Sequence, residues 1–240
     1  MDFFMTRGQH PDRMGIARYG PEHLTALGLC VLFSAAAAAV YGRLSPRRRT
    51  VMARALAWST VALEAGKDLF LLCRGAFGPD YLPLHLCSLS MLVLLADAAR
   101  PTGLTGDLLY SLTLPGAAAG VLFPNWLDLP VWTFLSLHSF LFHAILLAYP
   151  VMRLAAGTLR PNWRNLPRCF GLLLAAAAPI YWLNRRHNLN YLFLNGASPG
   201  SPLVALYALL GRQGYLLGLM GLVLLVWGLL YLPWMAARRG

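Results

Sequence analysis

Residues 215–236 read YLLGLMGLVLLVWGLLYLPWMA, a run that contains no charged side chain. A helix needs about 20 mostly apolar residues to cross the hydrocarbon core of a bilayer, so this stretch predicts a transmembrane helix. The whole chain has the same character, because 58% of its 240 residues are hydrophobic and only 12% are charged. A soluble domain carries about 25% charged residues, and this composition therefore argues against an ordinary soluble globule.

Six more apolar runs precede this one, and short connections join them. They cover residues 24–41, 52–72, 84–98, 108–122, 131–154 and 166–183. The pattern predicts an all-α fold, a polytopic membrane helical bundle of about seven transmembrane helices. We expect one membrane domain, residues 24–236, between an N-terminal tail of residues 1–23 and a C-terminal tail of residues 237–240.

The arginines are distributed unevenly between alternate connections. If seven helices alternate in direction, one side of the membrane holds twelve arginines and the other holds seven. Cytoplasmic loops are enriched in Lys and Arg, so we expect the N-terminus outside the cell membrane and the C-terminus in the cytoplasm. The same enrichment of cytoplasmic loops in basic residues explains the net charge of +11. Membrane lipids are therefore the expected partners and nucleic acid is not, while the oligomeric state stays open.

Polar and ionisable residues gather in the half of the predicted bundle that faces outside. Such residues are costly within a membrane, and each is a functional hypothesis by default. They are Glu64, Lys67 and Asp68 in the second run, His85 and Cys87 at the start of the third, His138 in the fifth, and Asn184, Arg185, Arg186 and Asn190 after the sixth. The inner half shows little that is comparable, so we expect a polar cavity that opens outward.

Structural roles remain open for several of these residues. Glu64, Lys67 and Asp68 share one helix face at i, i+3 and i+4, a spacing that also fits a self-neutralising cluster. His138 also fits a hydrogen bond to a neighbouring helix. His143, five residues further on, is expected to be structural.

Cys87 is the strongest candidate for chemistry. It lies at a predicted helix start, two residues after His85, where the helix dipole and an imidazole both favour the nucleophilic thiolate. Two alternatives stay open, namely a small buried apolar side chain and a disulfide with Cys73 across the short outer connection. The sequence contains no CxxC pair, no HExxH and no phosphate-binding glycine loop, so no metal and no other cofactor is predicted.

Two pairs of glycines lie four residues apart on predicted helices. They are Gly116 with Gly120, and Gly214 with Gly218. Small residues at this spacing let helix backbones approach closely. We expect both faces to pack inside the bundle rather than to form a dimer.

The stretch LPLHLCSLS at residues 82–90 resembles the LPLHLC signature of the YwaF family of bacterial integral membrane proteins. Downstream, NYLFL at residues 190–194 and PGSPL at residues 199–203 resemble the NYMFL–P–SLL segment of that family. Chain length and the number of spans fit too, and the resemblance covers about residues 24–234. The chain departs from the family at residues 211–215, which read GRQGY where members continue with a Gly-Pro-Trp-Pro-Trp-Tyr-like stretch.

The YwaF family is in turn similar to the transmembrane-protein-164 acyltransferases, which remodel ether phospholipids through a cysteine. This resemblance implies that Cys87 is an acyl-accepting nucleophile and that His85 or His138 is its base. The residues that we expect to contact the lipid head group are Arg185, Arg186, Asn190 and Tyr191.

The resulting prediction is a cysteine-dependent lipid acyltransferase or transacylase that acts on phospholipid or lysolipid in the outer half of the bilayer. Two other functions compete with it. One is a proton- or ion-coupled transporter of small molecules, in which the buried charges and His138 form a relay. The other is a non-catalytic membrane structural protein, in which the same charges serve packing.

Overall fold

The computed structural model describes residues 3–6 and 15–236, and every regular element within them is helical. The long helices are α1 (Pro21–Arg43), α2 (Pro46–Cys73), α3 (Leu86–Ala99), α6 (Phe134–Ala155), α7 (Leu166–His187) and α8 (Leu203–Ala236). Between α3 and α6 the chain forms α4 (Gly103–Leu108), the π-helix η2 (Leu109–Thr113) and α5 (Leu114–Leu122). Short 3₁₀ turns are η1 (Pro79–Tyr81), η3 (Trp163–Asn165) and η4 (Tyr191–Phe193). The predicted C-terminal tail, residues 237–240, lies outside the described residues.

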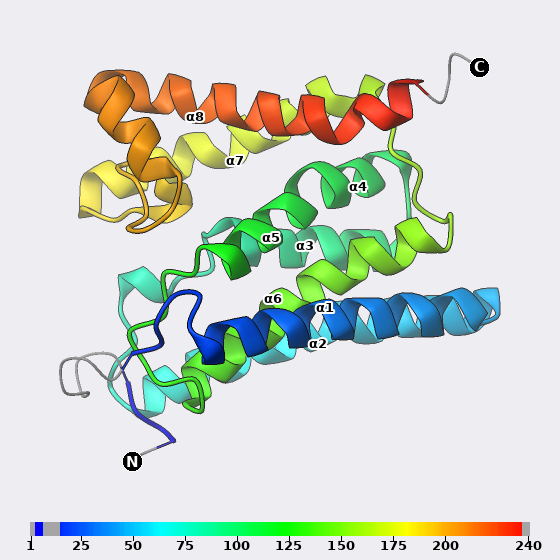
Figure 1. The fold of residues 1–240 in the computed structure, drawn as a ribbon, viewed down its shortest axis with the longest axis horizontal. Helices are drawn as coiled ribbons and strands as arrows, with labels where there is room; N and C mark the ends of the chain where they lie inside the picture. Colours follow the sequence, from blue (N-terminus) through cyan, green and yellow to red (C-terminus); the bar gives the residue numbers. More distant parts are fainter. Residues whose placement is uncertain (1–2, 7–14, 237–240) are drawn as a thin grey trace.

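The helices run along one long axis and form three layers (Figure 1). One layer contains α1, α2 and α6, the middle layer contains α3 and the segment α4–η2–α5, and the third contains α7 and α8. Successive passes alternate in direction, so that α1 begins and α8 ends at opposite ends of the bundle. We call the end where α1 begins the α1-start end, and the other the α8-end.

Five segments are long and apolar enough to cross a membrane by length and composition. They are α1, Pro79–Ala99 with α3, α6, Trp163–His187 with α7, and α8. Two further passes run alongside them, α2 with its internal charges and the broken segment α4–η2–α5 (Figure 1). The predicted all-α membrane bundle of about seven helices is therefore confirmed.

Helix α7 continues past the expected end of its apolar run at residue 183. It ends at His187, and Asn188 adopts the left-handed conformation (φ 55°) that terminates the helix. Arg185 and Arg186 therefore lie in the last helical turn and not in a loop after the helix, which corrects the sequence expectation. Basic side chains are favourable in this turn because the helix dipole is negative at its C-terminal end.

Helix α8 contains a kink at Gly211, whose φ of 64° is rarely adopted by residues with a side chain. The kink separates a short first segment, residues 203–210, from the long second segment. The short segment is helical, although the sequence predicted a loop before residue 215. Gly214 and Gly218 lie just after the kink and pack against Leu210. This glycine pair therefore faces the short first segment of α8.

The π-helix η2 occurs next to a proline. Pro115 has no backbone N–H, so the carbonyl of Ser111 loses its normal helical partner four residues on. Trp227 of α8 donates its indole N–H to this oxygen at 2.7 Å. A neighbouring helix thus satisfies the carbonyl that the proline leaves free, as a membrane interior requires.

The predicted packing role of Gly116 and Gly120 is confirmed. A Cβ at Gly116 would lie 2.7 Å from the Leu86 side chain of α3, and a Cβ at Gly120 would lie 2.7 Å from the His143 ring of α6. The two glycines therefore let α5 pack closely against two helices at once. An added methyl group at either position forces a shift of its neighbour.

Two buried carboxylates occupy the α8-end half of the bundle, and they correct the expectation that this half is poor in polar groups. Asp97 of α3 is fully buried and forms an ion pair with Arg153 of α6. Tyr149 and Thr105 also donate to its two oxygens, at 3.0 Å and 2.8 Å. Tyr149 and Arg153 of α6 lie 52 and 56 positions from Asp97 in the chain, which is why sequence spacing did not indicate the cluster.

The second carboxylate, Asp107 of α4, is also buried. It accepts hydrogen bonds from the Tyr231 hydroxyl at 2.8 Å, the backbone N–H of Asn162 at 2.8 Å and the Asn165 amide at 2.7 Å. These contacts connect α4 to α8 and to the segment that precedes α7. Both carboxylates are satisfied by protein partners, so we assign them a structural role.

Candidate active site

An ion-pair cluster lies on α2 within the half of the bundle nearer its α1-start end. The Lys67 ammonium is 2.8 Å from Oε1 of Glu64 and 3.2 Å from Oδ1 of Asp68. It also donates to the carbonyl oxygen of Tyr81 at 3.4 Å. The Glu64 side chain is 9% exposed and the Lys67 side chain 14%, so the pair is largely removed from solvent. One ammonium between two carboxylates leaves a net negative charge at this point.

Cys87 lies beside this cluster, in the first turn of α3. The helix begins here because the backbone of His85, its N-cap residue, is extended (φ −73°, ψ 158°). The first turn of a helix carries N–H groups without helical partners, and these favour a nearby anion. Cys87 is half-buried and has Glu64 and Lys67 as its charged neighbours. The next residue, Ser88, donates to Oε1 of Glu64 at 3.4 Å.

His138 approaches from α6. Its ring is 7% exposed, stacks on Phe142 at 5.7 Å between centroids, and lies against the main chain of Leu63. Lys67 is a charged neighbour of this ring as well as of Cys87. Among the described residues, Nε2 of His138 has no hydrogen-bond partner. A neutral imidazole with an unused nitrogen is able to accept a proton.

His143 has a different environment from His138. Its ring stacks on Trp126 with centroids 4.6 Å apart, and its Nδ1 lies 2.8 Å from the carbonyl oxygen of Ser139. The other side of the ring meets Gly120. These contacts hold the ring by packing, in line with the structural role expected for it.

His85 faces the connection between α7 and α8. Its ring meets Tyr191 edge to face, with centroids 4.8 Å apart, and Phe193 at 5.8 Å. The backbone of Tyr191 is held by the Asn184 side chain through two hydrogen bonds, at 2.8 Å and 3.0 Å. The Tyr191 hydroxyl donates to the carbonyl of Pro79, and burial, followed by the negative charge of Asp80, raises the pKa of Tyr191 to about 12. Tyr191 therefore stays protonated and positions the connection next to α3.

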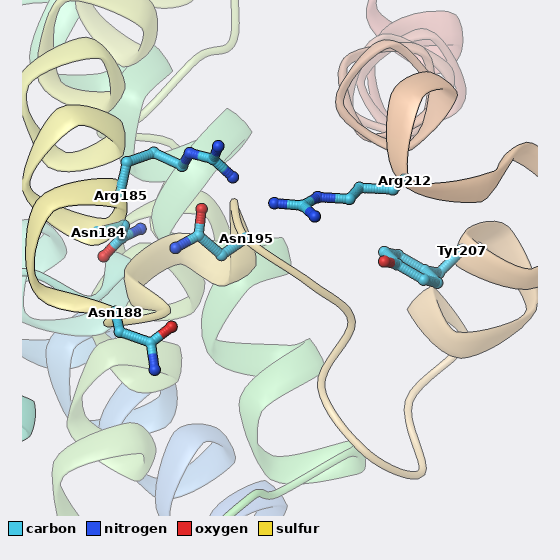
Figure 2. Close-up of a pocket in the computed structure, with 6 residues that line it drawn as sticks. All are labelled: Asn184, Arg185, Asn188, Asn195, Tyr207 and Arg212. Carbon is cyan, nitrogen blue, oxygen red and sulfur yellow. The ribbon is translucent and has the colours of Figure 1, made fainter.

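The residues expected to contact a lipid head group do not all lie together. A cavity of about 220 Å³, here called the α7–α8 cavity, opens between the end of α7 and the kink of α8 (Figure 2). The residues that line it are Asn184, Arg185, Asn188, Asn195, Tyr207 and Arg212. Arg186 is exposed on α7 and outside this lining, and the Asn190 amide is engaged by Gly196 and Asn195 within the loop.

Sequence reasoning did not select Arg212. It lies in the stretch that departs from the family pattern, directly after Gly211. The only available signal was a basic residue next to a glycine before a long apolar run, which is common at membrane boundaries.

The open alternative for Cys87, a disulfide with Cys73, is not present, because both cysteines are free thiols. Cys73 is exposed at the end of α2, whereas Cys87 is half-buried. Within the described part of the chain, no group of three or more His, Cys, Asp or Glu side chains has an arrangement that would hold a metal ion.

The fold and this site define a polytopic membrane protein in which three helices bring a cysteine, a histidine and an ion pair to one buried region. Comparison with known families agrees with that class, since residues 18–231 match the TMEM164 family. The chain belongs to the TMEM164 family. Comparison with curated proteins and with solved structures gives no significant match. The more specific resemblance to the YwaF family stays a prediction.

Proposed function

We propose that this protein is a cysteine-dependent acyltransferase of membrane lipids, with Cys87 as the nucleophile. The observation that carries the proposal is the position of this thiol, half-buried in the first turn of α3 and sharing Lys67 as a charged neighbour with His138 of α6. The free N–H groups of a helix start favour a thiolate, and a nearby imidazole is able to accept the thiol proton. Membership of the TMEM164 family and the resemblance of residues 82–90 support the same assignment.

The reaction consists of two acyl transfers. In the first, the Cys87 sulfur attacks the ester carbonyl of a phospholipid, a C–S bond forms, and the C–O bond to glycerol breaks. The thiol proton goes to a histidine and from there to the leaving alkoxide, so that a lysolipid departs. In the second, the hydroxyl of an acceptor lysolipid attacks the thioester, its proton returns through the histidine to sulfur, and the free thiol is regenerated. Covalent catalysis of this kind divides one difficult step into two easier ones.

His138 is the proposed base in this scheme. Its Nε2 has no partner among the described residues, and it comes from a different helix than Cys87. His85 is two residues from Cys87 in the chain, and its ring packs on Tyr191. His85 lies outside α3 as its extended N-cap residue, whereas His138 shares the charged neighbour Lys67 with Cys87, which favours His138.

The test is to trap the acyl-enzyme. Purified protein is mixed with a phospholipid that carries a fluorescent acyl chain, without any acceptor. We expect a labelled protein whose label is released by neutral hydroxylamine, and no label on Cys87→Ala. Cys73→Ala is the matched control, because it removes an exposed thiol near the same end and should label as wild type does. Equal labelling and equal acyl transfer by Cys87→Ala would exclude the mechanism.

A further inference from the structure

The lining of the α7–α8 cavity is polar and carries positive charge only. Its two ionic side chains are Arg185 and Arg212, and none of the other lining residues is acidic. Figure 2 shows the two guanidinium groups pointing toward one another across the cavity, with Asn195 beside the gap. Neither arginine forms an ion pair or hydrogen bond with another described residue. Two like charges that face each other are stabilised when an anion lies between them.

The fold itself creates this pair. Arg185 belongs to the last turn of α7, and Arg212 follows the kink of α8. The positive φ of Gly211 turns the chain there, so that the long segment of α8 begins opposite the end of α7 (Figure 1). A continuous helix through residue 211 would not produce this turn. The backbone turn at Gly211 is therefore what brings Arg212 opposite Arg185.

Asn195 supplies a second, independent observation. Its Nδ2 donates to the carbonyl oxygen of Leu189 at 2.7 Å, which determines the orientation of the amide. Its Oδ1 is buried and has no hydrogen-bond partner among the described residues. Buried acceptors are normally satisfied, so this oxygen is suited to a hydroxyl or amine donor of a ligand. The cavity therefore combines two cationic donors with one free acceptor.

The cavity lies at the level where helices end, next to the candidate active site. The ends of membrane helices mark the boundary of the hydrocarbon layer, where lipid phosphates are found. Asn184 lines the cavity and holds the backbone of Tyr191, and the Tyr191 ring contacts His85. The connection between α7 and α8 thus has the cavity on one side and the start of α3 on the other.

We propose that the α7–α8 cavity binds the phosphate of a membrane phospholipid head group, clamped between Arg185 and Arg212. Asn195 accepts a hydrogen bond from a donor in the same head group. Guanidinium groups suit this task because each presents paired N–H donors to phosphate oxygens. The role of the bound lipid as substrate rests on the proposed function, whereas phosphate binding itself does not.

The experiment measures binding in a background with greatly slowed turnover, the Cys87→Ser protein in detergent micelles. The probe is lysophosphatidylglycerol with a fluorescent acyl chain, and monoacylglycerol with the same chain is the probe without phosphate. We expect Arg185→Gln and Arg212→Gln each to weaken lysophosphatidylglycerol binding by about tenfold or more, the typical size of a lost charge-assisted contact. Monoacylglycerol binding should not change in either variant.

Arg186→Gln is the matched control, since Arg186 is the neighbouring arginine outside the cavity lining. It should bind the phosphate-bearing probe as the Cys87→Ser parent does. Equal losses in all three arginine variants would overturn the proposal, because they would indicate a general effect of surface charge. Wild-type affinity in both Arg185→Gln and Arg212→Gln would overturn it as well. Melting temperatures identify any variant that is misfolded, and Arg185→Lys and Arg212→Lys then replace the Gln variants, with a smaller loss expected.

Inorganic phosphate separates a lipid ligand from a free anion. We expect it to compete with lysophosphatidylglycerol only weakly, because it has no acyl chain to bury. Competition at lower concentration than the lysolipid itself would overturn the assignment to a lipid. If phosphate-dependent binding is observed but Cys87→Ala keeps transfer activity, the cavity assignment stands and the proposed catalytic function fails.

Discussion

Ser88 of α3 donates a hydrogen bond to Oε1 of Glu64 on α2, with 3.4 Å between the two oxygens. The same carboxylate oxygen contacts the Lys67 ammonium at 2.8 Å. The residue directly after Cys87 is therefore attached to the ion pair. Any change in the ion pair is expected to affect both the start of α3 and the charge near the thiol.

The two histidines near Cys87 should differ in their effect on acyl-enzyme formation. We expect His138→Gln to slow the step by about 100-fold or more, the usual size of a lost general base. His85→Gln should have a much smaller effect, because the His85 ring packs on Tyr191 and Phe193. Rapid-quench measurement of the labelled protein decides between them. If His85→Gln alone produces the large loss, the base assignment moves to His85.

The four cysteines should react at different rates with a small alkylating reagent. Cys73 is exposed and Cys87 is half-buried, whereas Cys30 and Cys169 are buried. We expect Cys73 and Cys87 to be modified in the folded protein and the other two only after unfolding. Intact-mass analysis without reductant should also show four free thiols. A stoichiometric mass loss of one disulfide, mapped to Cys73 and Cys87, would contradict the structure.

Lys67→Met should destabilise the protein by about 3 kcal/mol, because it leaves the Glu64 carboxylate buried without its cation. Lys67→Arg keeps the charge and should lose much less. The double variant Glu64→Gln with Lys67→Met should recover part of the loss, since neither charge is then left alone. Thermal unfolding in detergent measures each difference. A Lys67→Met protein as stable as wild type would show that the Glu64–Lys67 ion pair adds nothing to stability.

Arg153→Met should destabilise the opposite half of the bundle by a similar amount, about 3 kcal/mol, since Asp97 is fully buried and loses its counter-charge. Tyr149 and Thr105 still donate hydrogen bonds to the Asp97 carboxylate, which limits the loss of stability. Arg47→Gln is the control at the same end, because Arg47 is exposed at the start of α2. Equal melting temperatures for the two variants would mean that the Asp97–Arg153 pair adds nothing to stability.

The direction of the chain in the membrane can be tested by cysteine labelling in intact cells, in a Cys73→Ala background. Arg47→Cys and Asn188→Cys place thiols at opposite ends of the bundle, both at exposed positions. The arginine distribution predicts that a membrane-impermeant maleimide labels Asn188→Cys directly and Arg47→Cys only after lysis. The reverse pattern would invert the predicted orientation, and labelling of both positions in intact cells would contradict passes that alternate in direction.

The class of fold could be predicted from the amino-acid sequence alone. Apolar runs of membrane length are local features, and each of them forms a helix whatever its neighbours are. The spacing of Glu64, Lys67 and Asp68 is local as well, and it is sufficient to put three charges on one helix face. The fit of Gly116 and Gly120 against neighbouring helices followed from residue size alone.

The pairing of the buried polar groups could not be predicted from the sequence, because it depends on how the helices pack in three dimensions. Asp97 and Arg153 are 56 positions apart, and Trp227 reaches the carbonyl of Ser111 from 116 positions away. Arg212 faces Arg185 because a single glycine with positive φ turns α8. Helix periodicity reports which face of one helix is polar, but it contains no information on which helix lies opposite. That choice depends on the packing of the whole bundle, where each buried polar group must find its partner.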